Sequence, residues 1–369
     1  MYVILTILLL ALAFRIFSGA YRHNWFKNLS VSLRFAADGI FEGERGELVE
    51  TVSNNKMIPV FWGYLRFRVP GPLRFEGDAA GHDRFRQDKA SVFSYEETAR
   101  RFPFTAERRG FYRLDELQFV AGDPLFRYEM IAPFPGSPEL CVYPRAKDTG
   151  RFRIDAERIV GDCIARRSYA EDPFFFRGIR DYAPSDSLRN VNWKATARTG
   201  GLKVNEYHTT HAQQVMLLLD LDGYNRFDGY RIKEDTISAA AFLARKLSLT
   251  GTPVGFTTNA ADALTGGRME TRCRSGQSHF LSMMRGMAKI DTEKLLVPFD
   301  AILENLPSSA AGATQYLLVS YYYGDGLVRR LASLEARGLN IRWVFLHDGS
   351  RRTGFSRQPG MYVCEEGAE

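Results

Sequence analysis

The stretch VMLLLDLD, residues 215–222, decides the fold of the second half of the chain. Its continuous apolar run is typical of a strand buried on both faces of a sheet. Downstream, helical and apolar-strand patterns alternate; they predict helices over 233–249, 277–288, 299–305 and 326–338 and strands over 253–259, 315–323 and 341–348. Alternation of this kind predicts a largely parallel, doubly wound α/β domain.

Upstream of this region the pattern is different. From about Leu29 to Tyr143, short alternating runs such as LSVSLRF (29–35), GFYRLDELQFV (110–120) and ELCVYP (139–144) are separated by Gly, Asn and Pro. Apolar side chains at every second position predict strands with one buried face, and no helix of convincing length is indicated. We therefore expect an Ig-like β-sandwich.

The first residues form a third region. Residues 2–14, YVILTILLLALAF, carry no charge, and the apolar character resumes after Arg15. This stretch is slightly short of the roughly 20 residues that span a bilayer. No basic residue precedes the apolar core and Ser18-Gly19-Ala20 is a weak cleavage site, so an uncleaved anchor is favoured over a signal peptide.

Positive charge follows the apolar segment, at Arg15, Arg22 and Lys27. Because cytoplasmic flanks carry the excess of Lys and Arg, we expect a single-pass cell-membrane protein whose C-terminal domains are cytoplasmic. The cysteines have no disulfide or metal spacing, which agrees with a reducing compartment.

Composition excludes several classes of protein. The chain has 369 residues, of which 45% are hydrophobic and 25% charged, so it is neither disordered nor fibrous. The net charge of +6 comes from Lys and Arg dispersed among acidic residues, so we expect no nucleic-acid binding.

The segment FFFRGIRDYAPSDSLRNVNWKATARTGGLKVNEY, residues 174–207, precedes the decisive strand. It predicts a turn capped by Ser185 or Asp186, a helix that ends at Gly200-Gly201, and a strand over LKVNEY. A packed connector explains most of these positions. The basic residues around the helix are either paired with nearby acids or a docking face for an acidic partner, and pairing is favoured.

This segment resembles the family catalogued as domain of unknown function 58. The matching positions include Phe176, Gly178, Arg180, Tyr182, Asp186, Arg189, Val191, Asn192, Trp193, Lys194, Ala197 and Arg198, of which we take Gly178, Arg180, Tyr182, Asp186, Arg189, Asn192, Trp193, Lys194 and Arg198 as the family motif. Arg108-Arg109-Gly110-Phe111-Tyr112 and Val142-Tyr143-Pro144 agree with the family's β domain. Ser185 stands where glycine is usual, and one membrane segment is seen where members usually have two.

The resemblance implies a β-sandwich followed by a von Willebrand factor A-like α/β domain, in proteins that work with a MoxR-type AAA+ ATPase and have no established enzymatic activity. We expect an anchor over 1–21, a β-sandwich over 28–147, and the α/β domain over 148–369, including the FRGIRDYAPSDSLRNVNWKATAR connector.

The end of the decisive strand is the candidate for metal chemistry. A metal-ion-dependent adhesion site needs Asp-x-Ser-x-Ser, whereas this chain has Asp220-Leu221-Asp222-Gly223-Tyr224. Asp220 and Asp222 offer oxygen ligands to Mg²⁺. The region of Ser320 supplies no acidic ligand, so solvated or helix-capping aspartates are favoured and we expect no cofactor.

Two further interpretations stay open. The Asp220 and Asp222 pair also resembles the first motif of haloacid-dehalogenase-like phosphatases, in which one Asp attacks phosphorus and the other acts as acid and base. The second acidic partner of such Mg-dependent hydrolases is absent near Asp325, so this is the alternative. A structural envelope scaffold is the third interpretation. His208 and His211 show no third metal ligand.

The favoured function is that of a membrane-anchored, non-enzymatic protein-binding or scaffold protein. Strand ends converge at one edge of an open α/β sheet, where ligands and partners bind. We therefore expect a contact rim that consists of Asp220, Asp222, Tyr224, Thr258 and Asp325.

Overall fold

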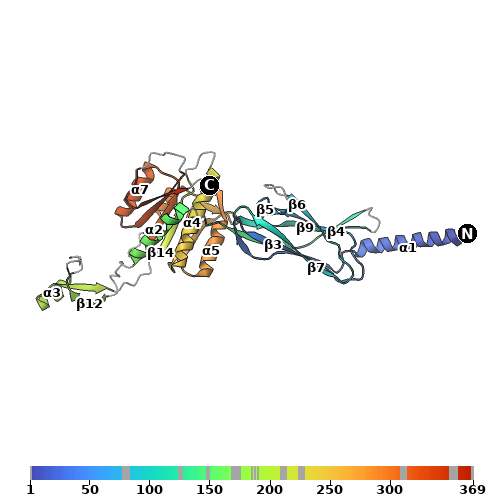
Figure 1. Ribbon diagram of the computed structural model, residues 1–369, viewed down its shortest axis with the longest axis horizontal. Coiled ribbons are helices and arrows are strands. Elements are labelled where there is room, and N and C mark those ends of the chain that lie inside the picture. Colours follow the sequence, from blue (N-terminus) through green and yellow to red (C-terminus); the bar gives the residue numbers. More distant parts are fainter. Residues whose placement is uncertain are drawn as a thin grey trace. The chain divides into compact units, whose positions relative to one another are not determined.

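A computed structural model describes residues 2–76, 84–123, 128–146, 150–167, 176–183, 186, 188, 191–207, 214–222, 229–307, 314–348 and 356–366 (Figure 1). The chain divides into two compact units, Met1–Arg145 and Ala146–Glu369. The division lies two residues before the boundary that the sequence indicates at 147.

The first unit begins with the helix α1, Tyr2–Asn24. Leu and Ala are frequent in its first four turns, and in a helix Leu loses little side-chain freedom and Ala loses none. Ile4–Asn24 is long and apolar enough to cross a membrane by length and composition. Side chains from Ile4 to Phe17 are exposed, whereas Ser18 and Tyr21 are buried by the rest of the unit. The helix thus continues three residues beyond the predicted anchor.

The remainder of this unit, which we call the β domain, consists of strands. They are β1 Leu29–Phe35, β2 Gly39–Phe41, β3 Arg45–Asn54, β4 Gly63–Val69, β5 Leu73–Phe75, β6 Arg84–Lys89, β7 Glu97–Ala106, β8 Gly110–Arg113, β9 Asp115–Gly122, β10 Glu129–Pro133 and β11 Glu139–Tyr143. They form sheets of order β1-β3-β7-β5, β10-β9-β4-β6 and β2-β11-β8. No helix occurs between Leu29 and Tyr143 in the part of the chain that is described.

The two four-stranded sheets share one core. Leu48 of the first sheet and Phe67 and Phe119 of the second belong to the same buried cluster. In β1, buried and exposed residues alternate along LSVSLRF as the sequence predicts. The predicted strand GFYRLDELQFV is instead two strands, because the chain passes at Leu114 from the sheet of β11 to the sheet of β4.

The second unit contains the predicted α/β region. Its elements are α2 Gly150–Arg167, β12 Phe176–Asp181, α3 Trp193–Thr199, β13 Lys203–Tyr207, β14 Gln214–Leu219, α4 Gly229–Leu249, β15 Val254–Asp262, β16 Arg268–Arg274, α5 Gln277–Ala288, β17 Ile290–Leu295, α6 Phe299–Glu304, β18 Thr314–Ser320, α7 Asp325–Ala336, β19 Asn340–Asp348 and β20 Met361–Glu366. A seven-stranded sheet has the order β16-β15-β14-β18-β19-β20, with β17 paired to β15.

The centre of this sheet is parallel. β14 pairs in parallel with both β15 and β18, and β18, β19 and β20 continue the parallel run. Leu218 of β14 packs in one cluster with residues of α6 and α7, whereas α2, α4 and α5 contact one another and strands β14, β15 and β20. Helices therefore cover both faces of a mixed α/β sheet, which makes β14 a central, doubly buried strand.

The element boundaries confirm most of the α/β prediction. Helix α5 has the predicted bounds, and α4, α6 and α7 lie within a few residues of theirs. Strand β14 ends at Leu219 and β18 at Ser320, each three residues before the predicted end. The sequence did not predict α2, β16, β17 or β20, of which α2 and the edge strand β16 carry charges that weaken the apolar pattern.

Candidate functional site

The candidate site begins where the central strands end. Parallel pairing places Leu219 beside Val319 on one side and Thr258 on the other, so Asp220 follows the strand between Ser320 and Asn259. The Ser320 hydroxyl donates to Oδ2 of Asp220 at 2.8 Å. The backbone N–H of Asp222 donates to Oδ1 of Asp220 at 2.9 Å. Both carboxylate oxygens of Asp220 thus accept hydrogen bonds from within the protein.

Burial sets the protonation of this carboxyl group. Asp220 is 2% exposed. Burial raises its pKa to about 7, the nearby charges of Asp222 and Asp300 act in the same direction, and the two hydrogen bonds oppose them. At neutral pH the group therefore exists in both protonation states. A proton bound to Asp220 would compete with a metal ion for the carboxylate.

Asp222 acts as a cap for a helix. Its Oδ2 accepts a hydrogen bond from the backbone N–H of Phe299, the first residue of α6. The first N–H groups of a helix have no partner within the helix, and a carboxylate is favourable there. This contact agrees with the structural interpretation of Asp222, that of a helix-capping aspartate.

The predicted contact rim is largely buried. Thr258 is 1% exposed, and with Asp220 it adds almost no area to a surface. Asp222 is half-buried and Asp325, in the first turn of α7, is exposed. Tyr224 lies outside the described residues. The prediction that these five residues form one contact rim is therefore wrong for Asp220 and Thr258, because Thr258 lies within the buried strand β15 and Asp220 directly follows the buried strand β14.

The sequence reasoning missed three residues of this network. Ser320 holds Asp220, Asn259 accepts a hydrogen bond from the backbone of Leu221 at 3.2 Å, and Asp300 raises the Asp220 pKa. Asn259 stands at the end of the predicted strand 253–259, which is the signal that could have found it, whereas Ser320 lies within the predicted strand 315–323 and is the last residue of the observed β18. Among the residues that the structure describes, no group of three or more His, Cys, Asp or Glu side chains could hold a metal ion.

The family motif forms a small unit of its own, which we call the motif unit, residues 176–207. β12 and β13 pair antiparallel in a two-stranded sheet, and Val191 bridges to the buried Val204. Helix α3 starts at Trp193, later than predicted, because Asn192 is its N-cap and accepts from the Ala195 N–H at 2.9 Å. The helix ends at Gly200, as predicted, in the left-handed conformation.

Asp186 has a different role from the predicted helix cap. Its two oxygens accept from both terminal nitrogens of Arg180, each at 2.6 Å, and Oδ2 also accepts from the Ala183 N–H at 2.8 Å. These hydrogen bonds lower the pKa of Asp186 to about 2. A bidentate pair of this kind fixes geometry as well as charge, so it holds the turn after β12 in place.

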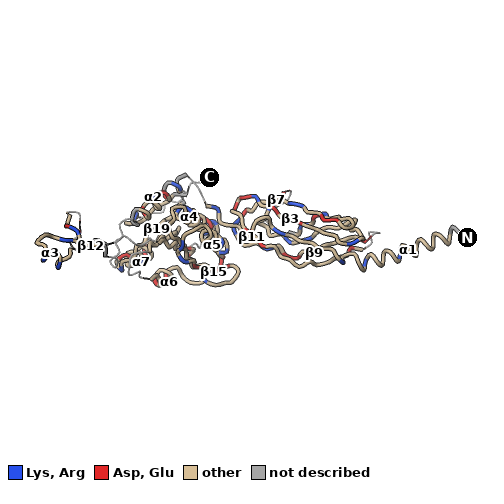
Figure 2. The backbone as a smooth tube through the Cα atoms, turned by 90° about the horizontal axis from the view of Figure 1, so that it is seen from below, with Lys and Arg blue, Asp and Glu red and all other residues tan. Residues whose placement is uncertain are grey.

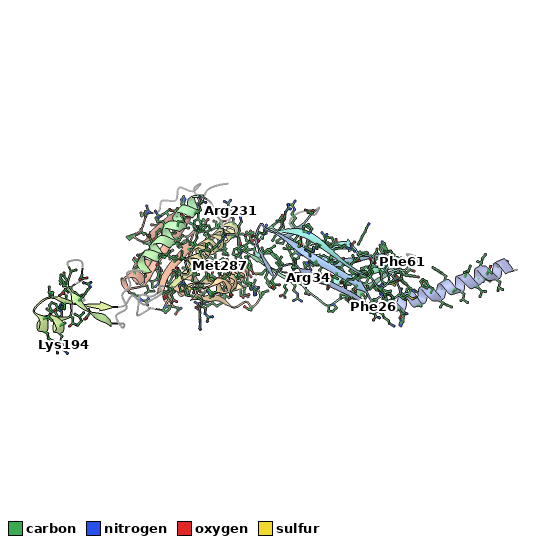
Figure 3. The ribbon with its side chains drawn as sticks, turned by 60° about the horizontal axis from the view of Figure 1, so that its bottom comes forward. Phe26, Arg34, Phe61, Lys194, Arg231 and Met287 are labelled. Carbon is green, nitrogen blue, oxygen red and sulfur yellow. The ribbon has the colours of Figure 1, made fainter. Side chains whose placement is uncertain are left out.

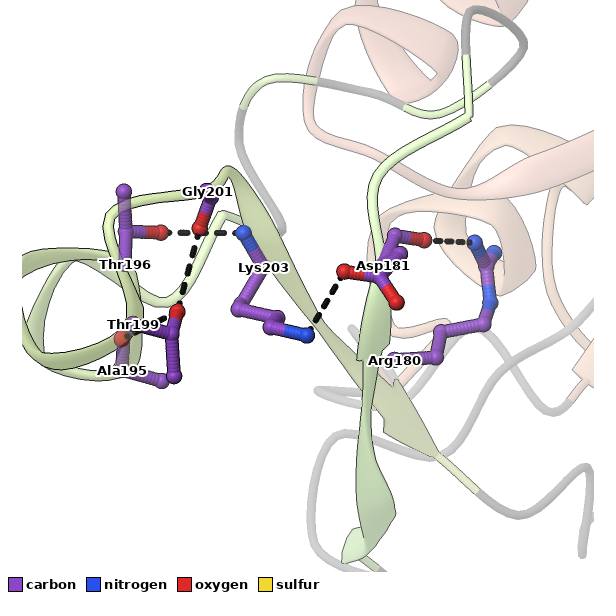
Figure 4. Close-up of polar contacts among 7 residues, drawn as sticks. All are labelled: Arg180, Asp181, Ala195, Thr196, Thr199, Gly201 and Lys203. Atoms are coloured by element: carbon purple, nitrogen blue, oxygen red, sulfur yellow. Dashed lines mark hydrogen bonds and ion pairs between the residues drawn. The ribbon is translucent and has the colours of Figure 1, made fainter.

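Other contacts join α3 to β13. The Lys203 backbone N–H donates to Oγ1 of Thr196 at 3.0 Å, and the Lys203 ammonium donates to Asp181 at 2.6 Å (Figure 4). The Asn192 side-chain amide donates to Asn205 at 2.7 Å. Hydrogen bonds thus fix this short helix against the hairpin.

The motif unit exposes apolar and basic side chains. Trp193 is 66% exposed, and Ile179, Leu188 and Leu202 are exposed as well. None of the seven residues of α3 is buried. Lys194 and Arg198, four residues apart on the same helix face, are also exposed, and Figure 3 labels Lys194 on this unit. Arg189, His208 and His211 lie outside the described residues.

Comparison with known proteins gives matches that include this region. Residues 178–343 match the family model described as "Protein of unknown function DUF58". The chain is also similar to the "Uncharacterized protein YeaD" of Bacillus subtilis (strain 168), with 23% identity over 237 residues, or 61% of this chain and 56% of the relative. The chain thus spans about half the length of this curated relative. The matched region includes both the motif unit and the Asp220 network.

Two solved structures are similar to about a third of the chain. The CARDB domain of the PF1109 protein from Pyrococcus furiosus, in complex with di-metal ions, covers 32% of this chain and 94% of its own, with 16% identity and a TM-score of 0.20. A non-cellulosomal cohesin from Archaeoglobus fulgidus covers 31% of this chain and 91% of its own, with 10% identity and a TM-score of 0.22.

Proposed function

We propose, from the match of residues 178–343 and from the motif unit within it, that this chain is a membrane-anchored, non-enzymatic protein that binds another protein through residues 176–207. Its first unit is an Ig-like β-sandwich behind a single-pass anchor, and its second unit is a von Willebrand factor A-like domain. The partner is a MoxR-type AAA+ ATPase, and both domains lie in the cytoplasm.

One observation carries the proposal. The motif unit holds a large aromatic side chain, Trp193, in an exposed position on a helix that buries none of its own residues. Burying a Trp on binding yields much of the energy of a protein interface, and Trp is among the residues most enriched at energetic hot spots. This energy is not gained while the indole of Trp193 is in contact with water, so binding of a partner that covers Trp193 is favourable.

The charges around Trp193 indicate what kind of partner fits. Lys194 and Arg198 are exposed on α3, whereas Arg180 is engaged by Asp186. A partner with an apolar pocket for the indole and acidic groups around that pocket would complement both features. The contacts of Asn192, Asp186 and Lys203 pre-order the surface, which lowers the entropy cost of binding.

The Asp220 network supports a structural role better than a catalytic one. Both oxygens of Asp220 accept hydrogen bonds, and Asp222 accepts from the Phe299 N–H. A carboxylate nucleophile needs a lone pair directed at its substrate, and this one is 2% exposed. The network joins the ends of β14 and β18 and so keeps the central sheet in register.

Affinity purification from membranes tests the proposal. The full-length tagged protein is solubilised from cells in native, Trp193→Ala and Leu264→Ala forms, and captured proteins are identified by mass spectrometry. Leu264 is exposed in the turn after β15 and serves as the matched apolar control. We expect an AAA+ ATPase with the native and control proteins, and a loss of about thirtyfold with Trp193→Ala, as for a hot spot worth about 2 kcal/mol. Capture of no AAA+ ATPase, or equal capture by all three forms, would overturn it.

A further inference from the structure

The end of α1 is built into the core of the β domain. Tyr21 and Trp25 are buried in the same cluster as the strands. The Tyr21 hydroxyl donates to the carbonyl of Pro59 at 3.3 Å, and the Trp25 ring stacks on Phe119 with ring centroids 6.3 Å apart. The helix therefore enters the β domain directly and is fixed to it by packing.

No polar spacer separates the exposed apolar part of α1 from the β domain. Exposed apolar side chains continue to Phe17, and Ser18 is already buried. Figure 2 shows few charged residues along the helix. Phe17 and Tyr21 are one helical turn apart, or about 6 Å along the axis. The headgroup layer on each side of a bilayer is about 5–8 Å thick. A bilayer that covers α1 up to Phe17 thus brings its headgroups to the β domain.

Four connections of the β domain meet at the end where α1 enters. Leu29 pairs with Asn54, and Gly63 pairs with Ala121, so the chain turns at this end after α1, β3, β6 and β9. These turns carry seven exposed apolar or aromatic side chains, which we call the aromatic collar: Phe26, Met57, Phe61, Trp62, Phe93, Tyr95 and Tyr128. Figure 3 labels Phe26 and Phe61 beside the end of α1.

The collar stands apart from the rest of the β domain in composition. In the described part of the β domain, the exposed large apolar side chains are those of the collar and two others, Phe85 and Ile131. Met57 reaches 76% exposure. Exposed apolar side chains that gather at one end of a domain mark a surface that a membrane or another molecule covers.

Polar side chains hold the collar turns in position. The Asn54 side-chain amide donates to the carbonyls of Ile58 at 3.0 Å and Phe93 at 2.7 Å, which ties the turn after β3 to the turn after β6. The Ser94 hydroxyl donates to the Met57 carbonyl. The apolar tips are thus exposed on an ordered framework, since their backbone is hydrogen-bonded.

We propose that the aromatic collar lies in the headgroup layer of the bilayer that α1 spans, so that the β domain is seated on the membrane surface. The occupant of the collar is phospholipid, because the collar lies at the end of the β domain where the apolar helix α1 enters it. Trp and Tyr are enriched at this depth in membranes. The guanidinium of Arg22 lies 5.5 Å from the centre of the Tyr128 ring, and its positive charge is attracted by anionic headgroups. The inference rests on the proposed membrane anchor.

Site-specific photo-crosslinking tests the seating. Benzoylphenylalanine, an aromatic residue of similar shape, replaces Phe61 or Phe93 in the full-length protein, which is reconstituted at one copy per lipid nanodisc and irradiated. The same replacement at Phe85, an exposed phenylalanine on β6, is the matched control. Replacement at Leu9, in the exposed part of α1, reports on the anchor itself.

The readout is the intact mass of the protein. We expect the mass of one phospholipid to be added at Leu9, Phe61 and Phe93, and not at Phe85. Lipid at Leu9 but not at Phe61 or Phe93 would overturn the collar inference and leave the anchor intact. No lipid at Leu9 would overturn both. In native membranes, crosslinks from Phe61 to a second copy of the chain instead of lipid would also overturn it.

Discussion

The hydroxyl of Ser320 and the carboxyl group of Asp220 join the ends of two neighbouring parallel strands at 2.8 Å. Ser320 also accepts from the Tyr322 N–H at 2.9 Å, so one small side chain has two hydrogen-bond partners. Hydrogen bonds to a charged group contribute about 1.5–3 kcal/mol, more than those to a neutral one. The strength of this link therefore depends on whether Asp220 is ionised.

The first prediction concerns Ser320→Ala. Removing the hydroxyl leaves Asp220 and the Tyr322 N–H with one hydrogen bond fewer, so we expect the free energy of unfolding to fall by about 1–3 kcal/mol. The loss should be larger at pH 8, where Asp220 is mostly charged, than at pH 5.5. Urea titration of the detergent-solubilised protein measures it. Ser282→Ala, at an exposed position of α5, is the control and should change little; equal losses for the two variants would contradict the prediction.

The second prediction concerns the pH dependence of stability through Asp220. Its folded-state pKa is raised to about 7, above the ordinary value of about 4, so between these values the folded protein binds more protons than the unfolded chain. The contribution of Asp220 to the free energy of unfolding therefore falls as pH rises from about 4 to about 7. The fall is about 1.4 kcal/mol for each unit by which the folded and unfolded pKa values differ, and the contribution is constant above about pH 7.

Asp220→Asn removes this titration. We expect the stability of the variant, relative to the native protein, to rise between pH 4 and pH 7 and then to level off. Burial also raises the pKa of Glu50 to about 7. Glu50 contributes equally to the stability of both proteins, so it does not affect the difference between them. Denaturant titrations at several pH values provide the test, with Asp325→Asn as the exposed control. Parallel stability curves for the native and Asp220→Asn proteins would show that folding does not raise the pKa of Asp220.

The sequence predicted the α/β order well because its strands are buried on both faces. In β14 and β18 the apolar run is continuous. In α5 the apolar residues recur with a clear helical period, which predicts both ends of the helix. Charged elements were missed for the opposite reason. The edge strand β16, RMETRCR, and the helix α2 carry many charges, and these charges weaken the apolar pattern that would predict them.

The candidate site was predicted less well, since its residues depend on how loops fold back. Asp220 was correctly placed directly after a strand, but Thr258 lies within β15 and not at its end. The burial of Asp220 accompanies its hydrogen bond from Ser320, a residue of another strand, which no local pattern contains. The start of α3 was predicted too early, because Asp186 and Asn192 are both good N-cap residues. Arg180 engages Asp186, and Asn192 is left to cap the helix.

The third prediction concerns Gly200, which ends α3 with a φ of 72°. A residue with a side chain pays about 1–2 kcal/mol to adopt this left-handed conformation. No neighbouring atom lies within 4 Å of the position that an added methyl group would occupy. The cost of the substitution is therefore that of the backbone conformation alone. Gly200→Ala should therefore increase hydrogen exchange at the Thr196 and Gly200 amides by at least about fivefold. Gly201→Ala, at the next residue with equal space and without a positive φ, is the control. Unchanged exchange in both variants would indicate that α3 does not depend on this cap.

The last prediction concerns the side of the membrane on which the two units lie. Arg15, Arg22 and Lys27 follow the apolar part of α1, and Lys and Arg are retained on the cytoplasmic side. We expect a cysteine introduced as Leu264→Cys, at an exposed turn, to react with a membrane-impermeant maleimide only after the cells are opened. The native protein is the blank, because its cysteines are free but buried or half-buried. Labelling of Leu264→Cys in intact cells would place the second unit outside and would exclude a cytoplasmic ATPase as the partner of the motif unit.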